Sequence, residues 1–265
     1  MAIRDRFDLV ILDWAGTTVD FGCHAPVIAL REAFARRGVA ISDAQARRDM
    51  GKPKVDHVRA LLKDPAIAKA WNEACGRAVE DTDVQGLMTD LAPLMRDQAA
   101  RAARLIEGAR SAIDSLRAEG IKVGSSTGYT REMMAPVLQE AAAQGYVPDH
   151  LVCSGETPAG RPSPLMIYKA CAELGVWPLS RVVKVDDTEA GVAEGRAAGC
   201  FTVGVSASGN TVGLSQAALL ALPPADRAAR LVAAERSLQA AGADAVIETV
   251  AQLIAVLRSA AQRRV

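Results

Sequence analysis

The sequence predicts a doubly wound α/β fold, in which a mostly parallel sheet carries helices on both faces and an all-helical cap domain is inserted. Short continuous apolar runs, of which residues 7–12 are the first, suit strands buried on both faces of a parallel sheet. Helical patterns with short connections separate these runs. Residues 22–103 contain no convincing strand, which predicts the helical insertion.

The elements follow the chain in alternation. After the first strand, further strands are predicted at residues 121–125, 150–153, 181–186, 201–205 and 245–247. Outside the insertion, helices are predicted at residues 111–118, 131–143, 164–174, 189–198 and 226–240, with a closing helix from residue 250. Thr130 is a candidate N-cap, but Pro136 falls inside the helix that follows. We therefore expect that helix to begin later or to kink.

The domain boundaries follow from the insertion. Residues 1–21 and 104–265 are predicted to form the core, and residues 22–103 the cap domain. Within the cap, helices are predicted at residues 26–37, 54–62 and 67–103. Because the insertion follows the first strand, it should lie over the carboxyl edge of the sheet, where open α/β sheets bind ligands.

Composition restricts the partners. The chain of 265 residues has 31 basic and 31 acidic side chains, so no global field favours nucleic acid or an anionic membrane. The apolar run Leu9–Leu12 is far too short for a signal peptide or a membrane span. Five widely spaced cysteines without a C-x-x-C pair indicate neither a zinc site nor a disulfide framework. We expect a cytoplasmic protein that binds a small molecule, and neither nucleic acid nor membrane.

Polar side chains follow three of the predicted strands. Asp13 ends the first, Asp186 and Asp187 end another, and residues 126–128 (Ser-Thr-Gly) offer a hydroxyl and backbone amides for an anion. Arg161 adds a cation whose fork geometry suits phosphoryl oxygens. Carboxylates on two strands of one parallel sheet can converge on a divalent cation, and Mg²⁺ prefers one or two carboxylates with substrate oxygens and water.

This order of nucleophile, hydroxyl, cation and acidic pair resembles the haloacid dehalogenase superfamily over almost the whole chain, which implies a haloacid dehalogenase-like core. Phosphatases of that superfamily usually read Asp-x-Asp, and the second Asp protonates the leaving alkoxide. Here that position is Ala15. General acid catalysis is worth roughly 10²–10⁴ in rate. Its loss favours a carbon leaving group whose electrons enter an imine on a lysine.

Residues 13–20, 50–57, 127–134 and 158–162 resemble one family of the superfamily, the phosphonoacetaldehyde hydrolases. The resemblance implies that Lys54 forms a Schiff base with the aldehyde and that Asp13 attacks phosphorus to give an aspartyl phosphate, with acetaldehyde and phosphate as products. It also implies Mg²⁺ bound by Asp13, the backbone carbonyl of Ala15 and Asp187. A homodimer joined through the cap helices is implied as well.

One departure from the family concerns the metal's surroundings. A member of the family carries Gly at position 186 and Asp at position 191, whereas this chain has Asp186 and Gly191. Asp186 could lie in the outer shell of the metal or be only a neighbour of the site.

Several features support Lys54 as an amine nucleophile. An exposed lysine has a pKa of about 10.4, so few are neutral at pH 7. A helix N-terminus, the charge of Lys52 and closure against an apolar core would all lower the pKa of Lys54. His57, one helical turn on, could move protons or simply pack. The predicted substrate-binding residues are His57, Thr127, Gly128, Arg161, Met50, Cys23 and Tyr129, although Met50 and Cys23 could equally be core residues.

Three other functions compete with this prediction. The nearest is a superfamily phosphatase that acts on a small phosphate ester, against which Ala15 argues. A haloacid dehalogenase would need neither the acidic pair nor a cap lysine. A phosphonate sensor without turnover would have no use for the nucleophile Asp13. No Walker-type or G-x-G-x-x-G loop indicates a nucleotide site.

Overall fold

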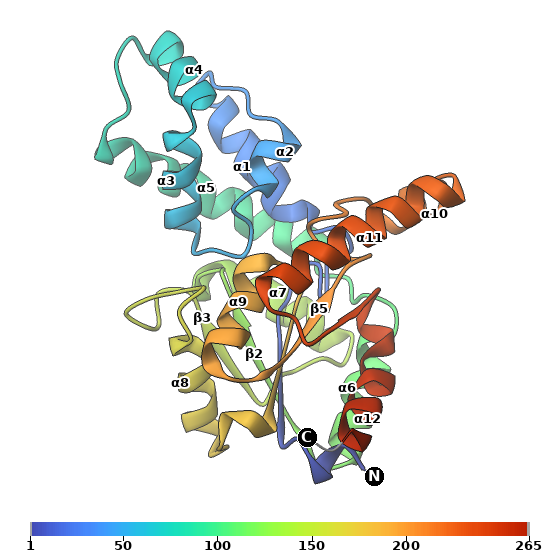
Figure 1. Ribbon diagram of the computed structural model, residues 1–265. Coiled ribbons are helices and arrows are strands. Elements are labelled where there is room, and N and C mark those ends of the chain that lie inside the picture. Colours follow the sequence, from blue (N-terminus) through green and yellow to red (C-terminus); the bar gives the residue numbers. More distant parts are fainter. Residues whose placement is uncertain (1, 264–265) are drawn as a thin grey trace.

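The computed structural model describes residues 2–263 and has a central parallel sheet (Figure 1). The strand order is β3-β2-β1-β4-β5-β6, and every neighbouring pair is parallel. The predicted α/β fold is therefore confirmed. The strands are β1 (Leu9–Leu12), β2 (Lys122–Thr127), β3 (His150–Cys153), β4 (Val182–Asp186), β5 (Phe201–Val205) and β6 (Ala245–Ile247).

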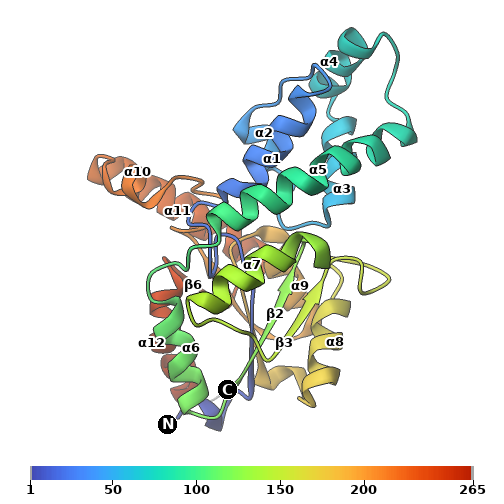
Figure 2. The same ribbon diagram turned by 180° about the vertical axis from the view of Figure 1, so that it is seen from behind.

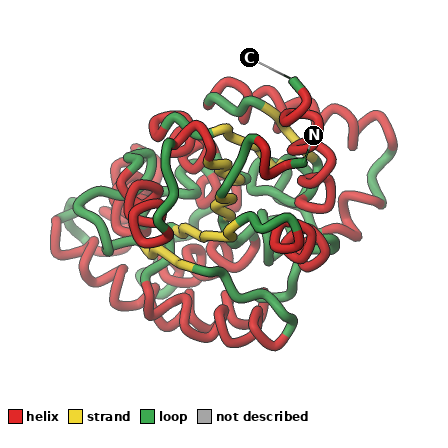
Figure 3. The backbone as a smooth tube through the Cα atoms, turned by 90° about the horizontal axis from the view of Figure 1, so that it is seen from below, coloured by secondary structure: helices red, strands yellow, loops and turns green. Residues whose placement is uncertain are grey.

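Helices cover both faces of this sheet, so the fold is doubly wound. Figure 3 shows the strands as one layer with helices on either side. The core helices are α6 (Ala109–Ala118), α7 (Arg131–Ala143), α8 (Leu165–Leu174), α9 (Glu189–Ala198), α10 (Gln216–Leu220), α11 (Pro224–Ala241) and α12 (Leu253–Gln262), with short 3₁₀ turns at Ile3–Asp5, Leu179–Arg181 and Val250–Gln252.

The first strand shows why an uninterrupted apolar run is needed. All of Leu9–Leu12 is buried. Val10 and Leu12 join the cluster that contains α6, α7 and α12, whereas Leu9 and Ile11 join the cluster that contains α8 and α9. Successive side chains of a strand point to opposite faces. Both faces of β1 are therefore apolar.

The register of the sheet determines which polar residues meet. Leu12 pairs with Ser125 of β2 and with Val185 of β4. The next residue along each strand, Asp13, Ser126 and Asp186, therefore comes to the same carboxyl edge.

Between β1 and α6 the described chain forms helices only, apart from single-residue bridges at Ala15, Val19 and Leu105. We call residues 24–102 the helical segment; Figures 1 and 2 show it beyond the carboxyl ends of the strands. Helix α1 packs against α5, and α5 also packs on α7 of the core. The helices are α1 (His24–Ala35), α2 (Asp43–Arg47), α3 (Lys54–Lys63), α4 (Pro65–Cys75) and α5 (Asp81–Ala102).

Several local details differ from expectation. The stretch predicted as helical at residues 67–103 forms two helices, α4 and α5, because Gly76 in the left-handed region ends α4. Helix α7 begins at Arg131 and continues through Pro136, so a later start is wrong. The Thr130 hydroxyl caps it by accepting from the Met133 N–H at 3.4 Å, and Met133 and Val137 are buried in the core. Helix α2 was not predicted, although Ser42 and Gln45 form a capping box at its start.

Within residues 2–263, no helix combines the length and the apolar character needed to span a bilayer.

Candidate active site

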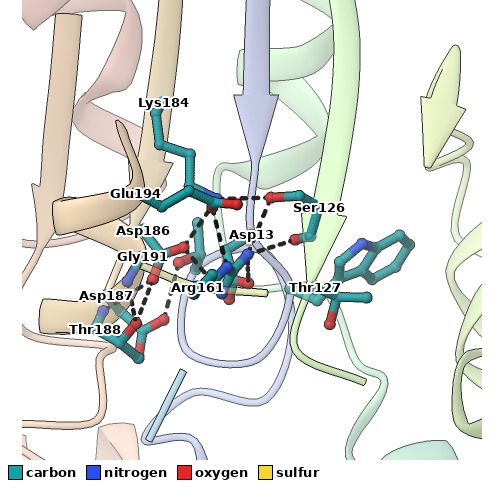
Figure 4. Close-up of polar contacts among 12 residues, drawn as sticks. Asp13, Ser126, Thr127, Arg161, Lys184, Asp186, Asp187, Thr188, Gly191 and Glu194 are labelled. Atoms are coloured by element: carbon teal, nitrogen blue, oxygen red, sulfur yellow. Dashed lines mark hydrogen bonds and ion pairs between the residues drawn. The ribbon is translucent and has the colours of Figure 1, made fainter. Parts of the chain in front are cut away.

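Arg161 lies at the centre of a buried ion network at the carboxyl edge (Figure 4). Only 4% of its surface is exposed. Its Nη2 lies 2.8 Å from Asp13 Oδ1, its Nη1 lies 3.2 Å from Asp186 Oδ2, and its Nε lies 3.0 Å from Glu194 Oε2. Nη2 also donates to the backbone carbonyl of Ser126 at 2.8 Å. The guanidinium therefore holds the Asp13 carboxylate in one position.

Lys184 supplies the second cation of this network. It belongs to β4 and is fully buried. Its Nζ lies 3.0 Å from Asp186 Oδ2 and 3.2 Å from Glu194 Oε2, and it donates to Ser126 Oγ at 2.8 Å. Asp186 and Glu194 are therefore each paired with two cations, a geometry that compensates their desolvation.

We call Asp13, Asp186 and Asp187 the acidic cluster. One carboxylate oxygen from each lies within 4.8 Å of the others, and all three residues are buried. Burial and the charge of Asp186 raise the pKa of Asp13 to about 6. Burial raises the pKa of Asp187 well above its usual range, and the charge of Asp13 adds to this.

Asp186 behaves differently. Burial raises its pKa, but Arg161 and Lys184 outweigh burial and hold the pKa below its usual value. Among the described residues Asp187 has no ion-pair partner, and Asp13 has Arg161 alone, so the cluster keeps excess negative charge at these two carboxylates. A divalent cation bound between these two carboxylates would neutralise it, so the cluster fits a metal.

The combination of Asp186 with Gly191 has a steric explanation. A Cβ at Gly191 would lie 2.0 Å from Cγ of Asp186. The Asp186 carboxylate, which accepts from the Thr188 hydroxyl at 2.7 Å, fills the space that any side chain at position 191 would need. A carboxylate at position 186 therefore requires glycine at 191.

A small, partly open cavity of about 20 Å³ lies between this edge and the helical segment. A volume of that size holds about one water molecule. The residues that line it are Asp13, Ala15, Cys23, Pro26, Met50, Gly51, Lys54, Thr127, Gly128, Tyr129, Arg161 and Thr188.

Most of the predicted site residues therefore meet around one cavity. Asp187 belongs to the acidic cluster but does not line the cavity, and His57 does not line it either. Pro26, Gly51 and Thr188 were not predicted, although Gly51 and Thr188 directly follow predicted residues in the chain. Gly51 also lies within the motif at residues 50–57, which was a second signal for it.

Lys54 enters the cavity from the helical segment. It is the first residue of α3 and only 3% exposed. Its Nζ lies 3.6 Å from Met50 Sδ and 5.4 Å from the centre of the Tyr129 ring. Within the described chain it makes no ion pair with a carboxylate. Burial lowers its pKa to about 8, so a substantial fraction is neutral amine near neutral pH.

His57 is buried one turn from Lys54, as predicted. Burial lowers its pKa to about 2, and the charge of Lys54 contributes. The ring therefore stays neutral at ordinary pH. Together with its position outside the cavity lining, this argues for a packing role rather than contact with a ligand.

The loop before α3 closes tightly on the core. A Cβ at Gly51 would lie 2.2 Å from the Thr188 hydroxyl, and one at Gly128 would lie 3.1 Å from the Gly51 carbonyl oxygen. Glycine at these two positions favours the close approach of the loop to Thr188 and to the chain at Gly128. Gly51 and Gly128 both line the cavity beside Lys54.

Comparison with known proteins agrees with this arrangement. A family model described as haloacid dehalogenase-like hydrolase matches residues 7–199. The phosphonoacetaldehyde hydrolase of Syntrophobacter fumaroxidans is 49% identical over 239 residues, which cover 90% of this chain and 86% of the relative. This chain belongs to the phosphonoacetaldehyde hydrolase family.

Further members of that family give the same result. The phosphonoacetaldehyde hydrolase of Paraburkholderia xenovorans is 46% identical over 94% of this chain and 93% of its own length. A crystal structure of a phosphonoacetaldehyde hydrolase-like protein from Oleispira antarctica matches with a TM-score of 0.95 and 41% identity, covering 97% of this chain and 93% of that one. The likeness to this family therefore spans the sheet and the helical segment.

Sequence reasoning missed Lys184 and Glu194, although a signal was present. Lys184 interrupts the apolar run of a strand that is buried on both faces. A charge at such a position requires a buried partner. The sequence did not show which residue is the partner of Lys184, because Glu194 belongs to a different element, helix α9.

We expect Lys184→Met to reduce the free energy of unfolding by about 3–5 kcal/mol, because Asp186 and Glu194 would lose a buried cation. Urea unfolding measures the loss. Lys169→Met is the control: its Nζ lies 3.8 Å from Glu156 in a partly exposed pair, so it should cost less than about 1 kcal/mol. Equal losses in the two variants would contradict the compensating role of Lys184.

Proposed function

We propose that this protein hydrolyses the carbon–phosphorus bond of phosphonoacetaldehyde to acetaldehyde and phosphate, with Mg²⁺ as cofactor. The observation that carries the proposal is the meeting of two groups at one small cavity. Lys54 contributes an unpaired buried amine, and Asp13 contributes a carboxylate held by Arg161. Family membership supports the same reaction.

Lys54 would act first. Its neutral amine adds to the aldehyde carbon, and loss of water leaves an imine that takes up a proton. Asp13 then attacks phosphorus. The carbon–phosphorus bond breaks, and its electron pair moves into the imine to leave an enamine on Lys54. Protonation of the enamine carbon gives the imine of acetaldehyde, and water releases acetaldehyde from it. A second water hydrolyses the aspartyl phosphate.

Ala15 supports a carbon leaving group. It lines the cavity two residues after Asp13, where a carboxylic acid would be needed to protonate a departing alkoxide. The imine accepts the electrons of the broken bond instead, so no general acid is needed at that step.

We assign the Mg²⁺ site to Asp13, Asp187 and the backbone carbonyl of Ala15. When bound, Mg²⁺ would neutralise phosphoryl oxygens and the two carboxylates whose pKa values are raised. Arg161 holds Asp13 in line and adds positive charge beside the incoming phosphoryl group.

We propose that residues 22–103 act as a cap that opens for substrate and closes for reaction. The cavity holds about one water molecule, which is less room than the substrate needs, and this supports a cap that moves to admit it. Closure brings Lys54 to the sheet edge and excludes bulk water. The homodimer through the cap stays a prediction, as does the cytoplasmic location.

Purified protein with Mg²⁺ should release phosphate from phosphonoacetaldehyde at least about a hundredfold faster than from small phosphate esters, because Ala15 cannot protonate an alkoxide. A phosphate-release assay with and without a chelator measures both rates. Faster turnover of the esters would favour the phosphatase alternative. Unchanged turnover of phosphonoacetaldehyde after chelation would refute the metal assignment.

The rate of imine formation on Lys54 should follow the fraction of Lys54 that is free amine, with a midpoint near pH 8. Below that pH the reactive fraction falls about tenfold per unit; above it the rate should level off. Acetaldehyde with cyanoborohydride is a suitable probe because acetaldehyde has no titrating group. Peptide mass spectrometry would measure the rate of ethylation at Lys54.

Lys52→Ala is the matched control, since Lys52 is partly exposed and pairs with Asp49. It should leave the pH profile of Lys54 unchanged, because burial lowers the pKa of Lys54 and the charge of Lys52, contrary to the expectation from the sequence, is not among the causes. A midpoint near pH 10.5 would contradict a desolvated amine. Full turnover by Lys54→Arg would refute the imine mechanism.

A further inference from the structure

Arg47, at the end of α2, joins the helical segment to the core without a carboxylate partner. Its Nη1 donates to the carbonyl oxygens of Gly22 at 2.9 Å and Asn210 at 3.4 Å, and its Nη2 donates to that of Gly213 at 3.2 Å. Asn210 and Gly213 belong to the core loop after β5. Within the described chain, Arg47 appears in no ion pair. Its charge is used to hold backbone segments together.

Asn210 connects Arg47 to the acidic cluster. Its Oδ1 accepts from Arg47 Nη1 at 3.2 Å, and its Nδ2 donates to the Arg47 carbonyl oxygen at 3.0 Å. Its backbone N–H donates to Asp187 Oδ2 at 2.8 Å. One residue thus contacts both an arginine of the helical segment and the carboxylate assigned to the metal.

The loop after β5 has little freedom between these two contacts. A Cβ at Gly213 would lie 2.8 Å from Arg47 Cζ, and one at Gly209 would lie 2.7 Å from Asp187 Cβ. The loop therefore packs directly against Arg47 on one side and Asp187 on the other. A shift of Arg47 would move the backbone that orients the carboxylate.

We propose that Arg47 and Asn210 are positioning residues that orient Asp187 for Mg²⁺ when the cap is closed. The inference rests on the metal site of the proposed function. Opening the cap would withdraw Arg47 and release the loop with the Asn210 N–H. The Thr17 hydroxyl, at 3.1 Å, would then be the remaining described donor to the Asp187 carboxylate. Cap closure and metal affinity are therefore linked, and linkage of this kind is reciprocal.

Direct Mg²⁺ binding, measured by titration calorimetry without substrate, tests the proposal. We expect Arg47→Ala and Asn210→Ala each to weaken Mg²⁺ binding at least about fivefold, the lower range of coupling between sites. Arg36→Ala is the matched control, because Arg36 pairs only with Glu32 of its own helical segment. It should bind Mg²⁺ as wild type does.

The double variant separates positioning from simple stabilisation. If Arg47 acts through Asn210, Arg47→Ala/Asn210→Ala should bind Mg²⁺ no more weakly than Asn210→Ala alone. Arg47→Lys, which keeps the charge but lacks the fork, should lie between wild type and Arg47→Ala. It also serves as the test if Arg47→Ala does not fold.

Additive losses in the double variant, or wild-type Mg²⁺ affinity in Arg47→Ala, would overturn the proposal. Because binding is read without turnover, its failure is distinct from failure of the proposed reaction. Weakened Mg²⁺ binding in both variants would support the positioning role even if phosphonoacetaldehyde were not cleaved.

Discussion

A buried amine without a carboxylate partner is the constraint on which this active site depends. Lys54 is buried, and among residues 2–263 it has no ion-pair partner to offset the loss of water. The drop of its pKa from 10.5 to about 8 corresponds to roughly 3 kcal/mol of differential solvation. The fold tolerates this because Met50 and the Tyr129 ring surround the amine. A neutral amine is the form that can attack an aldehyde.

The sheet side of the site has the opposite electrostatic character. Arg161 and Lys184 pair with Asp186 and Glu194 in a network with almost no exposure, and Arg161 also holds Asp13. This network holds Asp13, the proposed nucleophile, in a fixed position without a ligand, which is the preorganisation that the proposed phosphoryl transfer requires. In the proposed mechanism the charged sheet edge supplies the carboxylate and the helical segment supplies the amine.

The sequence allowed the fold and much of the site to be predicted for identifiable reasons. Apolar runs such as Leu9–Leu12 carry the signal of strands buried on both faces, and parallel topology places Asp13 and Asp187 at one edge. The role of Lys54 was predicted from the motif at residues 50–57. Arg47 contacts Asn210 across a long stretch of the chain, whereas Lys184 contacts Glu194 across the turn between a strand and the next helix. These contacts depend on loop paths and cap closure, which periodicity does not encode.

The most direct test of the central claim is the mass of the adduct on Lys54 after borohydride reduction in the presence of phosphonoacetaldehyde. Wild type should carry an ethyl group on Lys54, because Asp13 removes phosphorus before reduction. Asp13→Ala should carry a phosphonoethyl group on the same lysine, because the imine forms but the carbon–phosphorus bond stays intact. The same adduct in both proteins, or no adduct on Lys54, would contradict the claim that these two groups act on one molecule.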